Sequence, residues 1–124
     1  KFLGLGICVN DLDSASGYYS KLGFKKIEEK KARKEWKITS QEFYVSDIVF
    51  ELIQAEKDSI YGNSLAQRGD GVAEMIFKVS DLKTEMDLLK IKGTQILKVS
   101  DDKKMAYIDS CMKGNLLTRL IEKE

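Results

Sequence analysis

The chain has 124 residues, which is enough for one domain and too few for two independent hydrophobic cores. Its 21 basic and 20 acidic side chains leave a net charge of +1, which argues against nucleic-acid binding, and no apolar stretch approaches the about 20 residues that span a membrane. Histidine is absent, which excludes Ser-His-Asp and Cys-His catalysis and every metal site that needs imidazole.

The first half of the chain predicts a strand, a helix and three further strands. Apolar residues alternate along residues 2–9, as in a strand. Asp11 is a candidate N-cap, an apolar helical face follows it, and Gly23 stands where a helix C-cap is expected. Further strands are predicted over residues 24–30, 35–39 and 48–53.

The second half repeats this pattern. Val9-Asn10-Asp11-Leu12 recurs 70 residues later as Val79-Ser80-Asp81-Leu82, and Gly23 recurs as Gly93. Strands are predicted over residues 72–79, 94–99, 105–109 and 116–121, with a helix after Asp81. The segment between the halves is polar, with a short helix expected around residues 64–67. We therefore predict an α+β fold with one domain over residues 1–124, made of two tandem βαβββ modules, residues 1–54 and 72–124, joined by a connector over residues 55–71.

The two cysteines and the start of the chain bear on the compartment. Cys8 and Cys111 belong to no CxxC pair, and Cys8 lies in an apolar run, so we expect a buried thiol and no disulfide. Nothing at the start of the chain resembles a signal peptide. We therefore expect a cytoplasmic protein.

Several segments carry a family resemblance. The opening Gly4-Leu5-Gly6-Ile7-Cys8-Val9-Asn10-Asp11-Leu12, the connector Leu65-Ala66-Gln67-Arg68-Gly69-Asp70-Gly71 and the stretch Lys103-Lys104-Met105-Ala106-Tyr107-Ile108 resemble the vicinal oxygen chelate superfamily of glyoxalases, bleomycin-resistance proteins and dioxygenases. Within it, the methylmalonyl-CoA epimerases are the most similar branch. The resemblance implies a curved mixed sheet around a cleft, a small-molecule ligand and a homodimer, with no nucleic-acid or membrane partner.

The same resemblance implies four metal-ligand positions, typically His, Gln or Glu, His and Glu, which fall here on Gly4, Glu51, Glu74 and Arg119. Only Glu51 is a ligand of the expected kind, because Gly4 has no side chain and Arg119 stays cationic. We therefore expect no metal and no other cofactor. Instead, Arg119 should lie within hydrogen-bonding distance of Glu51 or Glu74 and replace the metal. The alternative is that these charges only satisfy leftover polar positions.

The sequence is compatible with three functions. The first is a metal-free protein that binds a small organic ligand, with an anionic group contacting Arg119 and with Gly4, Trp36 and Tyr107 lining the cleft. The second is an isomerase or lyase in which Glu51 and Glu74 are acid and base and Arg119 stabilises an enolate. The third is a structural role with a filled cleft.

Overall fold

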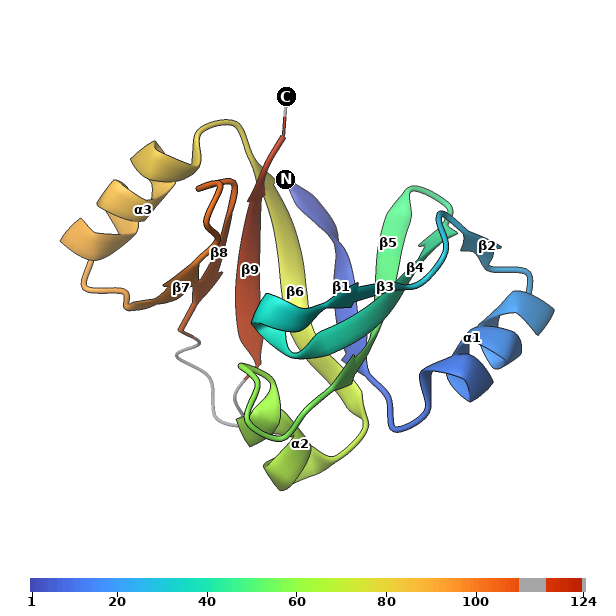
Figure 1. The fold of residues 1–124 in the computed structure, drawn as a ribbon. Helices are drawn as coiled ribbons and strands as arrows, with labels where there is room; N and C mark the ends of the chain where they lie inside the picture. The colour runs from blue at the N-terminus through green and yellow to red at the C-terminus, as the bar shows by residue number, and fades with distance from the viewer. Residues whose placement is uncertain (110–115, 124) are drawn as a thin grey trace.

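The structure is a computed structural model that describes residues 1–109 and 116–123. Within these residues, nine strands form one curved sheet, in the order β2-β4-β5-β1-β6-β9-β8-β7, with β3 paired to β4 (Figure 1). Among the described helices, none is long and apolar enough to cross a membrane. The elements are β1 (Phe2–Cys8), α1 (Leu12–Lys21), β2 (Lys25–Lys26), β3 (Lys31–Arg33), the 3-10 turn η1 (Lys34–Trp36), β4 (Ile38–Val45), β5 (Ile48–Ala55), α2 (Gly62–Arg68), β6 (Gly71–Val79), α3 (Leu82–Ile91), β7 (Ile96–Val99), β8 (Met105–Ile108) and β9 (Leu117–Glu122).

The sequence repeat corresponds to a structural repeat. In the first half β1 pairs in parallel with β5, and β5 pairs antiparallel with β4. In the second half β6 pairs in parallel with β9, and β9 pairs antiparallel with β8. The two halves meet where β1 and β6 pair antiparallel at the middle of the sheet. This is the α+β architecture expected from the sequence, with the same strand order in both copies.

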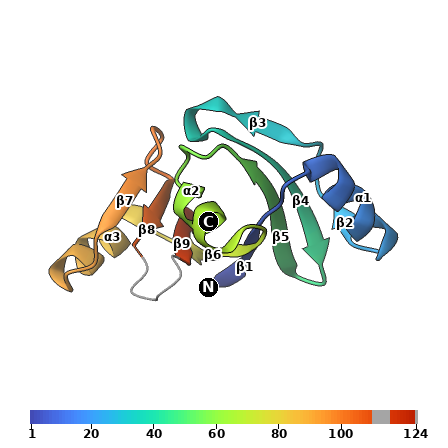
Figure 2. The same ribbon diagram turned by 90° about the horizontal axis from the view of Figure 1, so that it is seen from below.

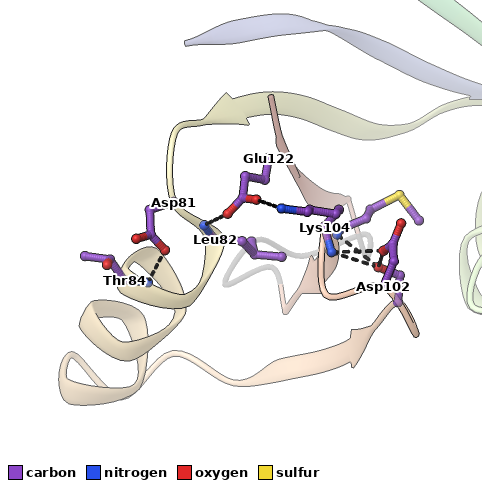
Figure 3. A network of polar contacts seen from close by, with 8 residues as sticks. Asp81, Leu82, Thr84, Asp102, Lys104 and Glu122 are labelled. Atoms are coloured by element: carbon purple, nitrogen blue, oxygen red, sulfur yellow. Dashed lines mark hydrogen bonds and ion pairs between the residues drawn. The ribbon is translucent and has the colours of Figure 1, made fainter. Parts of the chain in front are cut away.

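The ends of α1 and α3 are fixed by matching residues. Asp11 accepts a hydrogen bond from the Ser14 N–H at 3.1 Å. Asp81 accepts one from the Thr84 N–H, also at 3.1 Å, and Figure 3 shows this second cap. Both helices end before a glycine with positive φ, 91° at Gly23 and 83° at Gly93, a conformation that a residue without Cβ adopts without strain. The predicted caps are therefore confirmed.

Two further matching residues, one in each module, connect a helix to the last strand of that module by a hydrogen bond. Gln54 Oε1 accepts from the Leu12 N–H, and Glu122 Oε1 accepts from the Leu82 N–H, both at 2.8 Å. Glu122 also pairs with Lys104 (Figure 3). Since each of these N–H groups lies in the first turn of a helix and lacks a partner within it, the two side chains stabilise equivalent helix starts.

Two predicted strands have different bounds in the structure. Residues 24–30 contain only the two-residue β2, and residues 35–39 are divided between η1 and the start of β4. The long strand is β4, which continues to Val45 and pairs with β5 along its whole length. The reason is tertiary: the chain leaves the sheet at η1 so that Trp36 turns into the interior, where it is buried.

The core has three parts. On the convex face, α1 covers Leu52 and α3 covers Leu120, as the strand alternation predicts. Helices α1 and α3 flank the sheet, whereas α2 lies at one end of it (Figures 1 and 2). Cys8 is buried as expected, and Cys111 lies outside the described residues.

The third part of the core lies on the concave face. Its buried residues are Cys8, Trp36, Ile38, Ile53, Tyr61, Ala73, Tyr107 and Leu117. The middle of the cleft is therefore filled by side chains.

Candidate functional site

Three buried charged side chains meet on the concave face. Arg119 Nη2 lies 2.6 Å from Glu51 Oε1, to which it donates a hydrogen bond, and 2.7 Å from Glu74 Oε1. Arg119 is 1% exposed, Glu51 3% and Glu74 0%. The ion-pair cluster predicted from the sequence is thus present, but its members lie beneath other side chains and not at an open floor.

The strand register explains why these residues meet. Gly6, at the centre of β1, is the partner of Glu51 on β5 and of Glu74 on β6. Arg119 on β9 pairs with Ile76, which is two residues from Glu74 and therefore on the same face. Four neighbouring strands thus bring one glycine, two carboxylates and one guanidinium together.

Two glycines of β1 make room for this arrangement. A Cβ built on Gly6 would lie 2.3 Å from Cγ of Glu74, so the Glu74 side chain occupies the space over Gly6. A Cβ on Gly4 would lie 1.8 Å from the carbonyl oxygen of Val49. No side chain fits at Gly4 without movement of β5. The sequence pointed to Gly4, but Gly6 is the glycine that lies against the charged cluster.

Two tyrosines connect the cluster to the rest of the concave core. The Tyr61 hydroxyl donates to Glu74 Oε2 at 2.9 Å and lies 2.7 Å from the Tyr107 hydroxyl. When Glu74 is ionised, its Oε2 atom accepts the hydrogen bond from the Tyr61 hydroxyl, so the Tyr107 hydroxyl is the donor to Tyr61. The Met105 sulfur adds a contact 3.8 Å from Arg119 Nη1.

Trp36 packs against Tyr107. Its ring centroid lies 5.2 Å from that of Tyr107, and it is 5% exposed. Lys98 Nζ lies over the same ring, 4.3 Å from its centroid. Of the residues expected to line the cleft, Trp36 and Tyr107 therefore contact each other, whereas Gly4 lies in the sheet beside Val49.

The two carboxyl groups of the cluster have pKa values that are shifted in opposite directions. Burial, together with the nearby charge of Glu51, raises the pKa of Glu74 to about 7, although Arg119 acts in the opposite direction. Burial also acts to raise the pKa of Glu51, but the Arg119 guanidinium outweighs it and leaves that pKa below its ordinary value. Burial raises the pKa of Tyr107 to about 12. The cluster therefore holds one ionised carboxylate beside Arg119 and one carboxyl that exchanges a proton near neutral pH.

The donor set does not suit a divalent metal. Arg119 Nη2 occupies the position between the two carboxylates, and within the described parts of the chain no three acidic or cysteine side chains converge as a metal site requires. Arg119 Nη2 lies close to Glu74 Oε1, but this contact lacks hydrogen-bond geometry. In residues 1–109 and 116–123 that oxygen, Glu51 Oε2 and Arg119 Nε are buried without a hydrogen-bond partner. Only two of these atoms are carboxylate oxygens, and their side chains share one guanidinium, whereas hard cations prefer six or more oxygens.

A cavity of about 440 Å³ opens above the cluster, between the two modules. Glu42, one of its lining residues, is the cross-strand partner of Glu51, and Met105, another, contacts Arg119. Burial and the charge of Glu51 raise the pKa of Glu42. The lining residues are Arg33, Glu35, Trp36, Glu42, Ser100, Asp101, Asp102, Lys104, Met105, Ile121 and Lys123.

Sequence reasoning missed Tyr61 and Glu42. Tyr61 lies in the connector, outside any periodic pattern, and the only sequence signal for it is the apolar pair Ile60-Tyr61 within a polar segment. Glu42 lies in the part of β4 that was not predicted as a strand, so its face was not assigned. Its alignment with Glu51 follows only from the observed β4–β5 register.

Comparison with known proteins agrees with this architecture. Residues 1–111 match the family model of the Glyoxalase/Bleomycin resistance protein/Dioxygenase superfamily, and no curated protein matches the sequence. Among solved structures, a hypothetical protein from Bacillus halodurans has a TM-score of 0.83 at 16% identity, covering 100% of this chain and 94% of its own. A methylmalonyl-CoA epimerase in complex with methylmalonyl-CoA and NH4+ has a TM-score of 0.82 at 20% identity, covering 99% and 94%. The epimerase from Mycobacterium tuberculosis has 0.82 at 23%, covering 99% and 87%.

These structural likenesses describe the fold, and the family model covers most of the sequence. Both agree with the paired βαβββ modules and the curved sheet described above. The chain belongs to the Glyoxalase/Bleomycin resistance protein/Dioxygenase superfamily.

Proposed function

We propose that this protein binds a small organic ligand in the cleft of its curved sheet without a divalent metal. The observation that carries the proposal is the position of Arg119, whose Nη2 atom lies within 2.7 Å of carboxylate oxygens from both Glu51 and Glu74. A built-in cation there neutralises one of the two carboxylates and contacts both, which weakens their attraction for a metal. Arg119 therefore has a positioning role in the proposal.

The ligand site in this proposal is the cavity of about 440 Å³ above the cluster. Trp36 forms an aromatic wall of that cavity, and Tyr107 lies behind Trp36. Arg33 and Lys123 line the same cavity and make no ion pair within the described part of the chain, so they are available to an anionic group of the ligand. Gly4, on strand β1, stays a predicted lining residue of the ligand site.

Two measurements test the proposal. Elemental analysis of the purified protein should find no stoichiometric divalent metal. A library of small organic acids, amines and neutral compounds should yield ligands that change the fluorescence of Trp36, the only tryptophan in the chain. About one equivalent of metal, removed by a chelator together with ligand binding, would contradict the metal-free proposal. A library without any ligand would instead favour the structural role.

A second candidate function is an isomerase or lyase. The observation in its favour is the pKa of Glu74, about 7, because a general acid or base is most effective when its pKa is near the working pH. Glu74 and Glu51 would act as acid and base, with Arg119 in place of the metal as electrostatic stabiliser.

Methylmalonyl-CoA in D2O tests this candidate, since structurally similar proteins are epimerases of that compound. We expect no enzyme-dependent deuterium incorporation at the carbon between the two carbonyl groups. Incorporation that survives a chelator and disappears in Glu74→Gln would establish the enzymatic function and replace the binding proposal.

We also propose a cytoplasmic homodimer. The middle of the convex face supports it, because α1 packs on β4 and β5, α3 packs on β9, and the apolar side chains of Phe2 and Val72 are exposed on β1 and β6. Sedimentation should give twice the chain mass, and Val72→Glu should give a monomer. A monomeric unaltered protein would contradict the dimer without affecting the ligand proposal.

A further inference from the structure

Trp36 lies between the cavity and the buried tyrosine next to it, Tyr107. One side of the residue lines the cavity of about 440 Å³, and its ring contacts Tyr107 with centroids 5.2 Å apart. Behind Tyr107 lies the Tyr61 hydroxyl, which is hydrogen-bonded to Glu74. On this side of the cavity, Trp36 therefore lies between a bound molecule and the hydrogen-bonded chain Tyr107–Tyr61–Glu74.

Lys98 holds Trp36 from the opposite module. Its ammonium nitrogen lies 4.3 Å from the centroid of the Trp36 ring, within the range of a cation–π contact. The same atom lies 3.5 Å from the carbonyl oxygen of Glu35, at the long limit for a hydrogen bond. Lys98 is on β7 of the second module, whereas Glu35 and Trp36 are on η1 of the first. One exposed side chain thus bridges the two modules at the mouth of the cleft.

The backbone around Trp36 is fixed at both ends. Lys37, which follows the turn, has a left-handed φ of 55° and pairs with Asp58 of the connector. Its carbonyl oxygen also accepts a hydrogen bond from the Glu56 N–H at 3.0 Å. At the other end, Arg33 on β3 pairs with Ile38 on β4, so the two strands close the turn. Trp36 can therefore move by rotation of its side chain, while the backbone of the turn and the connector stay in place.

We infer that Trp36 is a gate between the ligand cavity and the Glu51–Glu74–Arg119 cluster, and that Lys98 is its latch. This inference rests on the ligand-binding function proposed above and adds the regulation of that same site. Release of Lys98 lets the indole swing away from Tyr107 and opens the cavity toward the hydrogen-bonded chain Tyr107–Tyr61–Glu74. A ligand that competes for Lys98 or for the Trp36 ring would open the gate.

The single tryptophan makes the latch measurable in the ligand-free protein. In Lys98→Met, which keeps the length of the side chain but removes its charge, the quenching constant of Trp36 fluorescence by neutral acrylamide should rise about two- to fivefold, as expected for a lost cation–π contact. Lys98→Arg keeps a cation over the ring and should behave as the unaltered protein does. Lys92→Met, an equal change at the exposed end of α3, is the matched control and should leave quenching unchanged.

Carbodiimide labelling tests access to the carboxylates. Glu74, buried in the unaltered protein, should gain label in Lys98→Met and remain unlabelled in Lys92→Met, as read by peptide mass spectrometry. Equal quenching in the two methionine variants would overturn the latch, and increased quenching without labelling of Glu74 would overturn the gate. Neither measurement uses a ligand, so a failed gate leaves the binding proposal standing, and an unsuccessful ligand screen leaves the gate result standing.

Discussion

Gly6 leaves the space that the Glu74 side chain fills: a Cβ built on Gly6 would lie 2.3 Å from Cγ and 2.4 Å from Oε1 of Glu74. Both residues are in the middle of the sheet, on paired strands β1 and β6. Glu74 cannot lean away freely, because it is fully buried and contacts Tyr61 and Arg119. The absence of a side chain at position 6 is thus a condition for the buried cluster.

Gly6→Ala should therefore destabilise the protein by about 1–3 kcal/mol, the usual range for overpacking a filled core. Urea unfolding followed by circular dichroism measures the change. Gly17→Ala is the matched control: a Cβ there meets no atom within 4 Å, and Gly17 lies within α1. That change should stabilise the helix by about 0.5–1 kcal/mol. Equal effects of the two substitutions would contradict the packing of Glu74 over Gly6.

Arg119 should be the most sensitive member of the cluster. Arg119→Met leaves two carboxylates buried without their cation and should cost about 3–5 kcal/mol of stability in denaturant unfolding. Arg119→Met combined with Glu51→Gln removes one buried charge together with its partner. The double variant should therefore be more stable than Arg119→Met alone, and additive losses would mean that the two side chains do not interact.

The hydroxyl of Tyr61 should matter through Glu74. Tyr61→Phe leaves Glu74 Oε2 without the donor that now lies 2.9 Å away and interrupts the link to Tyr107. A buried acceptor that loses its donor costs about 1–3 kcal/mol, so thermal unfolding should shift downward. Tyr18→Phe is the comparison, because Tyr18 is exposed and should tolerate the change. An unchanged midpoint in Tyr61→Phe would show that this hydrogen bond does not stabilise the fold.

How much of this arrangement was predictable depends on the repeat. Because Asp11 and Asp81 cap equivalent helices, the strand order of one half predicts that of the other. Strand alternation placed Glu51 and Arg119 on one face, and a family comparison placed them in one site. Alternation along β1 does not decide which glycine lies opposite the carboxylates, because Gly4 and Gly6 share a face. That choice depends on the register between strands.

The filling of the cleft was not predictable in the same way. Tyr61 comes from the connector and Trp36 from a 3-10 turn, and neither belongs to a strand or a helix with a periodic apolar face. Charged neighbours surround Trp36 in the sequence, which is typical of an exposed position. Only the contact with Tyr107 shows why it is buried. Tertiary packing outweighs the local pattern at both residues.

Glu74 should make the protein less stable as the pH rises toward neutrality. Burial raises its pKa from 4.5 to about 7 in the folded chain, so the folded state binds this proton more tightly than the unfolded state does. The free energy of unfolding should therefore be highest below the unfolded pKa, decrease between 4.5 and about 7, and level off above that range. Glu51 acts outside this window, because Arg119 outweighs burial and lowers its pKa, so its contribution is lost only at more acidic pH.

Urea unfolding at a series of pH values across this window measures the slope, and Glu74→Gln identifies its source, because glutamine has the same shape and cannot titrate. We expect the variant to lose most of the decrease. A smaller slope of the same sign should remain from Glu42, whose pKa is raised by burial and by Glu51, and Glu42→Gln should remove that remainder. Parallel stability curves for the unaltered protein and Glu74→Gln would mean that the buried carboxyl keeps the same proton affinity in the folded and unfolded states, and the assignment of Glu74 as the titrating member of the cluster would then be wrong.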